Sequence, residues 1–121
     1  MPKVLIIDND WFFLEVTQDL LILHGFEVIS AKNARLGLQL AQTQAPDLII
    51  SDISMPEIDG YELLKALRKN SVTQNIPVIL ITGDGTDSIY LGARELGAND
   101  CLTKPYSIEQ LLQTIEAILK E

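Results

Sequence analysis

The apolar residues of the chain fall into five short runs, and a helical pattern follows each run. The runs are Lys3–Ile7, Glu27–Ala31, Leu48–Asp52, Pro77–Ile81 and Asp100–Thr103. Runs rich in Val, Ile and Leu are typical of strands buried on both faces of a parallel sheet, and the weaker second run is expected nearer an edge. The alternation predicts right-handed crossovers with helices on both faces. We expect an α/β, doubly wound, flavodoxin-like (βα)5 fold with strand order 2-1-3-4-5.

Capping residues predict where four of the helices begin. The expected N-caps, two of which have a Glu or Gln three positions later, are Asp10, Asn33, Asp59 and Ser107. In the helix from Trp11 to His24, the 3,4,3 spacing predicts a core face made of Phe13, Val16, Leu20 and Leu23. The opposite, exposed face would then hold Trp11, Leu14, Leu21 and Ile22. In the next helix, the expected apolar positions are Leu36 and Leu40 with the neighbouring Leu38 and Ala41.

Composition and charge narrow the classes of protein. The 121 residues are 47% hydrophobic and 21% charged, which indicates a globular chain with one core. The formal net charge of −8 argues against direct contact with nucleic acid, since no basic cluster could neutralise a run of phosphates. One cysteine cannot form an internal disulfide, and no stretch is typical of a signal peptide or a membrane span. We therefore expect a reducing, cytoplasmic location and no membrane partner.

The third run ends abruptly on a carboxylate, Asp52, and a Met55-Pro56 turn follows. By itself this pattern favours a turn or a helix cap. In a parallel sheet, however, ligands bind just beyond the carboxyl ends of the strands, so the residues after the other runs bear on the choice. Those polar residues are Asp8, Asn9, Asp10, Thr82 and Lys104.

The residue types at this predicted sheet edge suit phosphoryl transfer. Converging carboxylates repel one another unless a cation is present, and hard oxygen ligands suit Mg²⁺. A carboxylate such as Asp52 can act as the nucleophile and form an aspartyl phosphate. The Thr82 hydroxyl and the Lys104 ammonium could contact the remaining oxygens of the phosphoryl group. The set therefore describes transfer of a phosphoryl group onto Asp52 with charge spread over Mg²⁺ and Lys104.

Over essentially its whole length, taken as one domain from residue 1 to 121, the chain resembles the response-regulator receiver domain of two-component signalling. The matching motifs are Val4–Asp8, Pro46–Asp52, Met55-Pro56 with Asp59-Gly60, Ile81-Thr82, Gly97–Asp100 and Thr103–Pro105. The resemblance implies that Asp52 is the phosphoacceptor and that Thr82 and Lys104 contact its phosphoryl group. It also implies a Mg²⁺ site made of Asp8, Asn9, Asp52 and the backbone carbonyl of Ser54, and a cis Lys104–Pro105 bond.

The same resemblance implies the function and the partners. The phosphoryl group would come from a histidine kinase or a histidine phosphotransfer protein, and the signal would pass to a downstream protein target or a missing output domain. Such a domain is a phosphoacceptor rather than an enzyme, because it catalyses only its own phosphorylation and dephosphorylation.

Two positions depart from the pattern of the resembled family. Asn9 stands where a second acid is expected, so Mg²⁺ should bind more weakly, and Asp10 could compensate if it were not simply an N-cap. Cys101 stands where many receivers have a switch Tyr or Phe. A redox or metal role for Cys101 is the less favoured reading, because a lone buried cysteine usually behaves as a small hydrophobe.

Two alternatives to a phosphorylated receiver stay open from the sequence. An aspartate-nucleophile phosphatase of the haloacid-dehalogenase type would want a second Asp two residues after Asp52, where Ser54 stands. A pseudo-receiver would keep the fold as a protein-binding module without phosphorylation, and only Asn9 supports that reading.

Overall fold

The computed structural model contains one parallel five-stranded sheet in the order β2-β1-β3-β4-β5. It describes residues 1–83 and 85–120. The strands are β1 (Lys3–Ile7), β2 (Glu27–Ala31), β3 (Leu48–Asp52), β4 (Val78–Thr82) and β5 (Asp100–Thr103). The helices are α1 (Trp11–Leu23), α2 (Ala34–Gln44), α3 (Gly60–Lys69), α4 (Asp87–Glu95) and α5 (Ile108–Leu119). The predicted fold class and strand order are confirmed. None of the helices in the described ranges has the length and apolarity needed to cross a bilayer.

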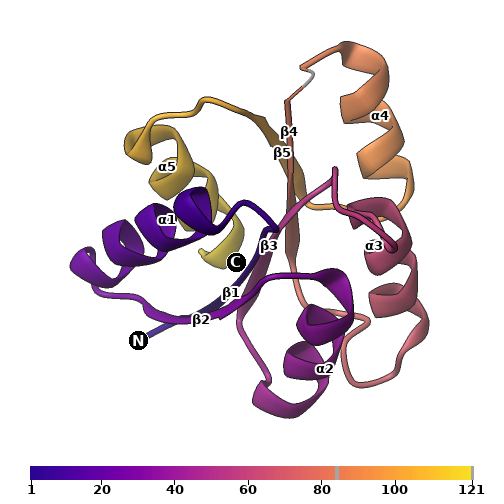
Figure 1. The fold of residues 1–121 in the computed structure, drawn as a ribbon, viewed down its shortest axis with the longest axis horizontal. Helices are drawn as coiled ribbons and strands as arrows, with labels where there is room; N and C mark the ends of the chain where they lie inside the picture. The colour runs from indigo at the N-terminus through magenta and orange to yellow at the C-terminus, as the bar shows by residue number, and fades with distance from the viewer. Residues whose placement is uncertain (84, 121) are drawn as a thin grey trace.

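The sheet separates two layers of helices. Figure 1 shows α1 and α5 over one face, and α2, α3 and α4 over the other. Side chains of β1 alternate between the layers: Val4 and Ile6 join the apolar cluster under α1 and α5, whereas Leu5 and Ile7 join the cluster under the other three helices. Because both faces are covered, a central strand such as β3 is buried throughout, which explains its unbroken apolar sequence.

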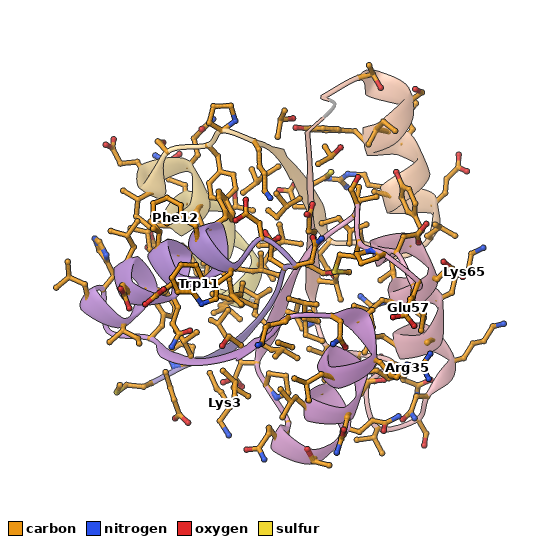
Figure 2. All side chains as sticks on the ribbon, viewed as in Figure 1. Lys3, Trp11, Phe12, Arg35, Glu57 and Lys65 are labelled. Carbon is orange, nitrogen blue, oxygen red and sulfur yellow. The ribbon has the colours of Figure 1, made fainter. Side chains whose placement is uncertain are left out.

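The predicted core face of α1 is wrong. The buried residues of this helix are Leu14, Thr17 and Leu21, whereas Leu23 is 78% exposed. The sequence of α1 is apolar on most sides, so its spacing was compatible with more than one orientation, and a buried threonine interrupts the true apolar stripe. Figure 2 shows Trp11 and Phe12 on the exposed side of the helix.

Small residues, rather than leucines, bring α2 close to the sheet. Its buried positions are Ala34, Gly37 and Ala41, of which Ala41 was expected. Leu38 and Leu40 are partly buried against the core as expected, whereas Leu36 is 37% exposed, contrary to the expectation for that residue. A Cβ at Gly37 would collide with the side chain of Ile7, so the helix can lie this near β1 only with glycine there.

The predicted caps are present. The Asp10 side chain accepts a hydrogen bond from the Phe13 N–H at 3.2 Å, and the Asn33 side chain accepts one from the Leu36 N–H at 2.8 Å. Helices α3 and α5 both begin with a complete capping box, formed by Asp59 with Glu62 and by Ser107 with Gln110. These local contacts satisfy otherwise unpaired N–H groups and fix where each helix leaves the edge of the sheet.

Candidate functional site

The polar residues predicted to converge come from the ends of neighbouring strands. Asp8 follows β1, Asp52 ends β3, Thr82 ends β4 and Lys104 follows β5. Strand β3 lies between β1 and β4, and β5 pairs with β4 so that Thr82 lies opposite Thr103. Parallel pairing therefore brings these four residues to the carboxyl-terminal edge of one sheet.

Lys104 lies between the carboxylates of Asp8 and Asp52, at the ends of β1 and β3. Its Nζ lies 3.1 Å from Oδ2 of Asp8, to which it donates a hydrogen bond, and 3.5 Å from Oδ2 of Asp52. Its backbone N–H donates to the Thr82 carbonyl oxygen at 2.7 Å, which ties the residue to the end of β4. The Lys104–Pro105 peptide bond is cis, as expected.

The site carries an excess of buried negative charge. Asp8 is 2% exposed and Asp52 is 8% exposed, and a single ammonium faces both carboxylates. Burial raises the pKa of Asp52 above its ordinary value, and the Asp8 carboxylate raises this pKa further, whereas Lys104 lowers it. A further cation beside the two carboxylates would relieve the repulsion between Asp8 and Asp52, which is the second cause of this shift after burial.

The segment after β3 is held close to Asp52. The Ile53 N–H donates to the Ile81 carbonyl oxygen at 2.9 Å, and the Gly60 N–H donates to the Ile53 carbonyl oxygen at 2.8 Å. A Cβ at Gly60 would lie 2.5 Å from the carbonyl oxygen of Asp52, so only glycine lets α3 start this close to the strand. Ser54, two residues after Asp52, is exposed.

Asn9 and Asp10 lie on the exposed loop between β1 and α1. The Asp10 N–H donates to Oδ1 of Asp8 at 2.9 Å, and its side chain caps α1, so the carboxylate of Asp10 already has a structural task. Within residues 1–83 and 85–120, no three His, Cys, Asp or Glu side chains are grouped closely enough to hold a metal by themselves.

The donor set nevertheless fits Mg²⁺. This ion keeps several waters and takes one or two carboxylates, with phosphate oxygens completing its octahedron. Asp8 and Asp52 are two buried carboxylates that could serve as such ligands, and Asn9, on the adjoining exposed loop, carries an amide oxygen.

Cys101 does not belong to this polar cluster. Its side chain is 3% exposed and packs in the apolar layer that α2, α3 and α4 cover. Burial, followed by the charge of Asp100, raises the pKa of the Cys101 thiol to about 11. The thiol therefore occupies this position as a small apolar group.

Sequence reasoning missed one neighbour of the site. The Lys104 Nζ lies 4.1 Å from the ring centroid of Phe13, which had been expected to point into the core. The Phe13 ring meets the ring of Tyr106 edge to face, with centroids 5.6 Å apart and an interplanar angle of 86°. The signal in the sequence that could have revealed this contact is the aromatic residue Phe13 in the first helical turn after Asp8, together with Tyr106 just beyond Lys104.

Comparison with known proteins assigns the family. The family model described as the response regulator receiver domain matches residues 4–116. Protein PilH of Pseudomonas aeruginosa is 35% identical over 119 residues, which cover 98% of both chains. The structure of the chemotaxis protein CheY4 of Vibrio cholerae superposes with a TM-score of 0.93 at 33% identity, covering 98% of this chain and 99% of that one. The chain belongs to the response-regulator receiver domain family of two-component systems, a family whose general function is phosphorylation and which is generally Mg²⁺-dependent.

Some relatives are longer than this chain. The CpxR homolog of Haemophilus influenzae, a transcriptional regulatory protein, is 39% identical over 120 residues. That match covers 99% of this chain but 51% of the relative, so the chain spans about half the length of several curated relatives that it matches. It spans nearly the whole length of PilH.

Proposed function

We propose that residues 1–121 form one receiver domain that accepts a phosphoryl group on Asp52 and signals through altered binding of a protein partner. The observation that carries this proposal is the position of Lys104, whose ammonium lies within 3.5 Å of both buried carboxylates. A structural ion pair would need only one carboxylate. The second buried carboxylate, that of Asp52 at the end of β3, is therefore available as a nucleophile.

In the proposed reaction, an oxygen of the Asp52 carboxylate attacks the phosphorus of a phosphohistidine. The new O–P bond forms as the P–N bond breaks, and the electron pair of that bond returns to the imidazole nitrogen of the donor. Lys104 and the Thr82 hydroxyl donate to phosphoryl oxygens, where negative charge develops. Lys104 then moves from a carboxylate neighbour toward the new phosphate, and its backbone anchor at Thr82 stays in place.

Asp8, Asn9, Asp52 and the Ser54 carbonyl would hold Mg²⁺. When bound, the ion neutralises charge on the transferring group and orients it. Asp8 is itself held for this task, because Asp10 and Lys104 donate to its two oxygens from different sides.

The proposed donor is a histidine kinase or a histidine phosphotransfer protein. The proposed recipient of the signal is a downstream protein or an output domain, and the net charge of −8 disfavours direct binding of this chain to nucleic acid. Because Asn9 replaces an acid, a pseudo-receiver that never becomes phosphorylated is the second candidate.

Mass spectrometry after incubation with acetyl phosphate and Mg²⁺ tests the proposal. We expect the protein to gain the mass of one phosphoryl group, and we expect Asp52→Asn to abolish the gain. Asp47→Asn is the matched control, since Asp47 is exposed just before the other end of β3. Its role as acceptor of the Lys3 N–H is one that asparagine can keep. No gain in the wild type would favour the pseudo-receiver, and repeated turnover of a phosphate ester would favour the phosphatase.

A further inference from the structure

An aromatic ring lies against the ammonium of the site's only lysine. Phe13 is half-buried at the third position of α1, and the Asp10 cap fixes this helical turn through the Phe13 N–H. The Lys104 Nζ lies 4.1 Å from the centroid of its ring, within the range of a cation–π interaction. Nothing in the chemistry of Asp52 itself requires an aromatic residue at this place.

We propose that Phe13 is a positioning residue for phosphoryl transfer, which holds the Lys104 ammonium over the acceptor carboxylate. This inference rests on the proposed function. Phe13 acts only through Lys104 and makes no contact with the reacting atoms.

The geometry around Nζ gives the reason. Asp8 and Asp52 approach the ammonium at 3.1 and 3.5 Å, and the ring of Phe13 is its third neighbour. A lysine side chain has about four rotatable bonds and samples many rotamers unless its surroundings restrict it. The ring attracts the positive charge without requiring a directed hydrogen bond. The ammonium can therefore shift from Asp8 toward a phosphoryl oxygen while it stays in contact with the ring.

Two contacts hold the Phe13 ring in place. The backbone of Phe13 belongs to α1, and the Phe13 ring packs at 86° to the ring of Tyr106, which follows Pro105 in the segment after β5. Tyr106 is partly buried against the cluster under α1 and α5. Perpendicular aromatic packing of this kind is favourable and limits rotation of both rings. Helix α1 and the Lys104 segment thus form one clamp around the ammonium.

The test compares three single variants in labelling by acetyl phosphate. Phe13→Leu removes the π face and keeps an apolar side chain, and we expect it to lower the rate constant about three- to tenfold, the size expected for a lost cation–π contact. Phe13→Tyr keeps the π face and should retain the wild-type rate. Phe12→Leu is the matched control, because Phe12 is the adjacent residue and is 69% exposed, and it should leave the rate unchanged.

A double-mutant comparison separates positioning from simple packing. In a Lys104→Met background, Phe13→Leu should cause no further loss, since the ring would have no ammonium to hold. A further loss of the same size there, or an unchanged rate in Phe13→Leu alone, would overturn the proposal. Urea denaturation of each variant shows whether a lost rate reflects lost folding.

A measurement without phosphorylation keeps this inference separate from the proposed function. In NMR spectra of the wild type and of Phe13→Tyr, the ring should shift the Lys104 ε-methylene protons upfield, and Phe13→Leu should abolish the shift. Absence of the shift in the wild type overturns the contact. If the shift is present but the wild type takes no label, the proposed function fails, and with it the catalytic purpose assigned to the contact.

Discussion

The hydroxyl of Tyr90 on α4 lies 2.6 Å from the hydroxyl of Thr103, the last residue of β5. Thr103 directly precedes Lys104, whose ammonium contacts both buried carboxylates. The loop before α4 is close as well, because a Cβ at Gly85 would lie 2.5 Å from Oγ1 of Thr103. A displacement of Lys104 on phosphorylation would therefore be transmitted to α4 through the hydrogen bond between Thr103 and Tyr90.

This connection predicts that the loop and helix from Gly83 to Leu96, of which residue 84 lies outside the described residues, report phosphorylation rather than an aromatic residue at the position of Cys101. Hydrogen exchange with and without beryllofluoride should change most in this segment. Gly92 lies in α4 and costs the helix about 1 kcal/mol relative to alanine. An added Cβ there meets no atom within 4 Å, so Gly92→Ala should stabilise α4 and damp the change. Altered protection confined to the surroundings of Cys101 and Tyr106 would contradict this account.

The asparagine in the acidic pair predicts weak binding of Mg²⁺. Asn9→Asp restores a negative charge next to the buried Asp8, and we expect Mg²⁺ affinity to rise about tenfold. The fluorescence of Trp11, two residues away, can follow the titration. Asn75→Asp adds the same charge at an exposed site before β4 and should change little. Unchanged affinity in Asn9→Asp would remove Asn9 from the proposed ligand set.

Two leucines near the end of α1 test the observed orientation of this helix. Leu21 is fully buried and Leu23 is 78% exposed, the reverse of the expectation from spacing. Leu21→Ala should lower the free energy of unfolding by about 2–5 kcal/mol, because it removes buried apolar contacts and leaves a cavity. Leu23→Ala should change it by less than about 0.5 kcal/mol. Urea denaturation measures both, and similar losses in the two variants would mean that α1 is oriented otherwise.

The contrast between α1 and α3 shows which packing could be predicted from sequence. Helix α3 has a polar face and a narrow apolar stripe, in which Leu63, Leu64 and Leu67 are all buried. Helix α1 is apolar on most sides, so only contact with the sheet decides which side faces inward. The parallel sheet and the helix caps were predictable, since they depend on the alternation of strands and helices and on a contact within one turn. Strand order is not visible in a sequence, and the order 2-1-3-4-5 was expected only from the flavodoxin-like arrangement.

The same distinction applies to the site. The meeting of Asp8, Asp52 and Lys104 follows from parallel strand ends, which the sequence marks. The ring of Phe13 over Lys104 depends on a side-chain direction in α1 and on the path of the chain after Pro105. The hydrophobic periodicity of the sequence predicts neither this side-chain direction nor this path, because both arise only when distant segments pack together.

The raised pKa of Cys101 predicts an unreactive thiol. With a pKa of about 11, the thiol is almost entirely protonated at pH 8, and the thiolate is the form that reacts with iodoacetamide. Burial also blocks access of the reagent. We expect alkylation of the folded protein at pH 8 to be far slower than in urea and to accelerate as urea unfolds it. Labelling of the native protein as fast as that of the unfolded chain would give Cys101 a reactive role after all.

Trp11 provides the last prediction, which concerns the encounter with the phosphodonor. Its side chain is 65% exposed at the start of α1, beside the loop that carries Asn9, and Ile22 is 50% exposed near the other end of the same helix. Of the face once expected to be exposed, these two residues alone remain on the surface, since Leu14 and Leu21 are buried. An exposed tryptophan next to a reaction site is a typical anchor for a protein partner.

Trp11→Ala should slow phosphotransfer from the cognate histidine kinase about tenfold or more and should leave labelling by acetyl phosphate intact. Val72→Ala, at a 63% exposed position after α3, should affect neither reaction. Loss of both reactions in Trp11→Ala would indicate damage to the site or to the fold, and loss of neither would place the kinase on another surface.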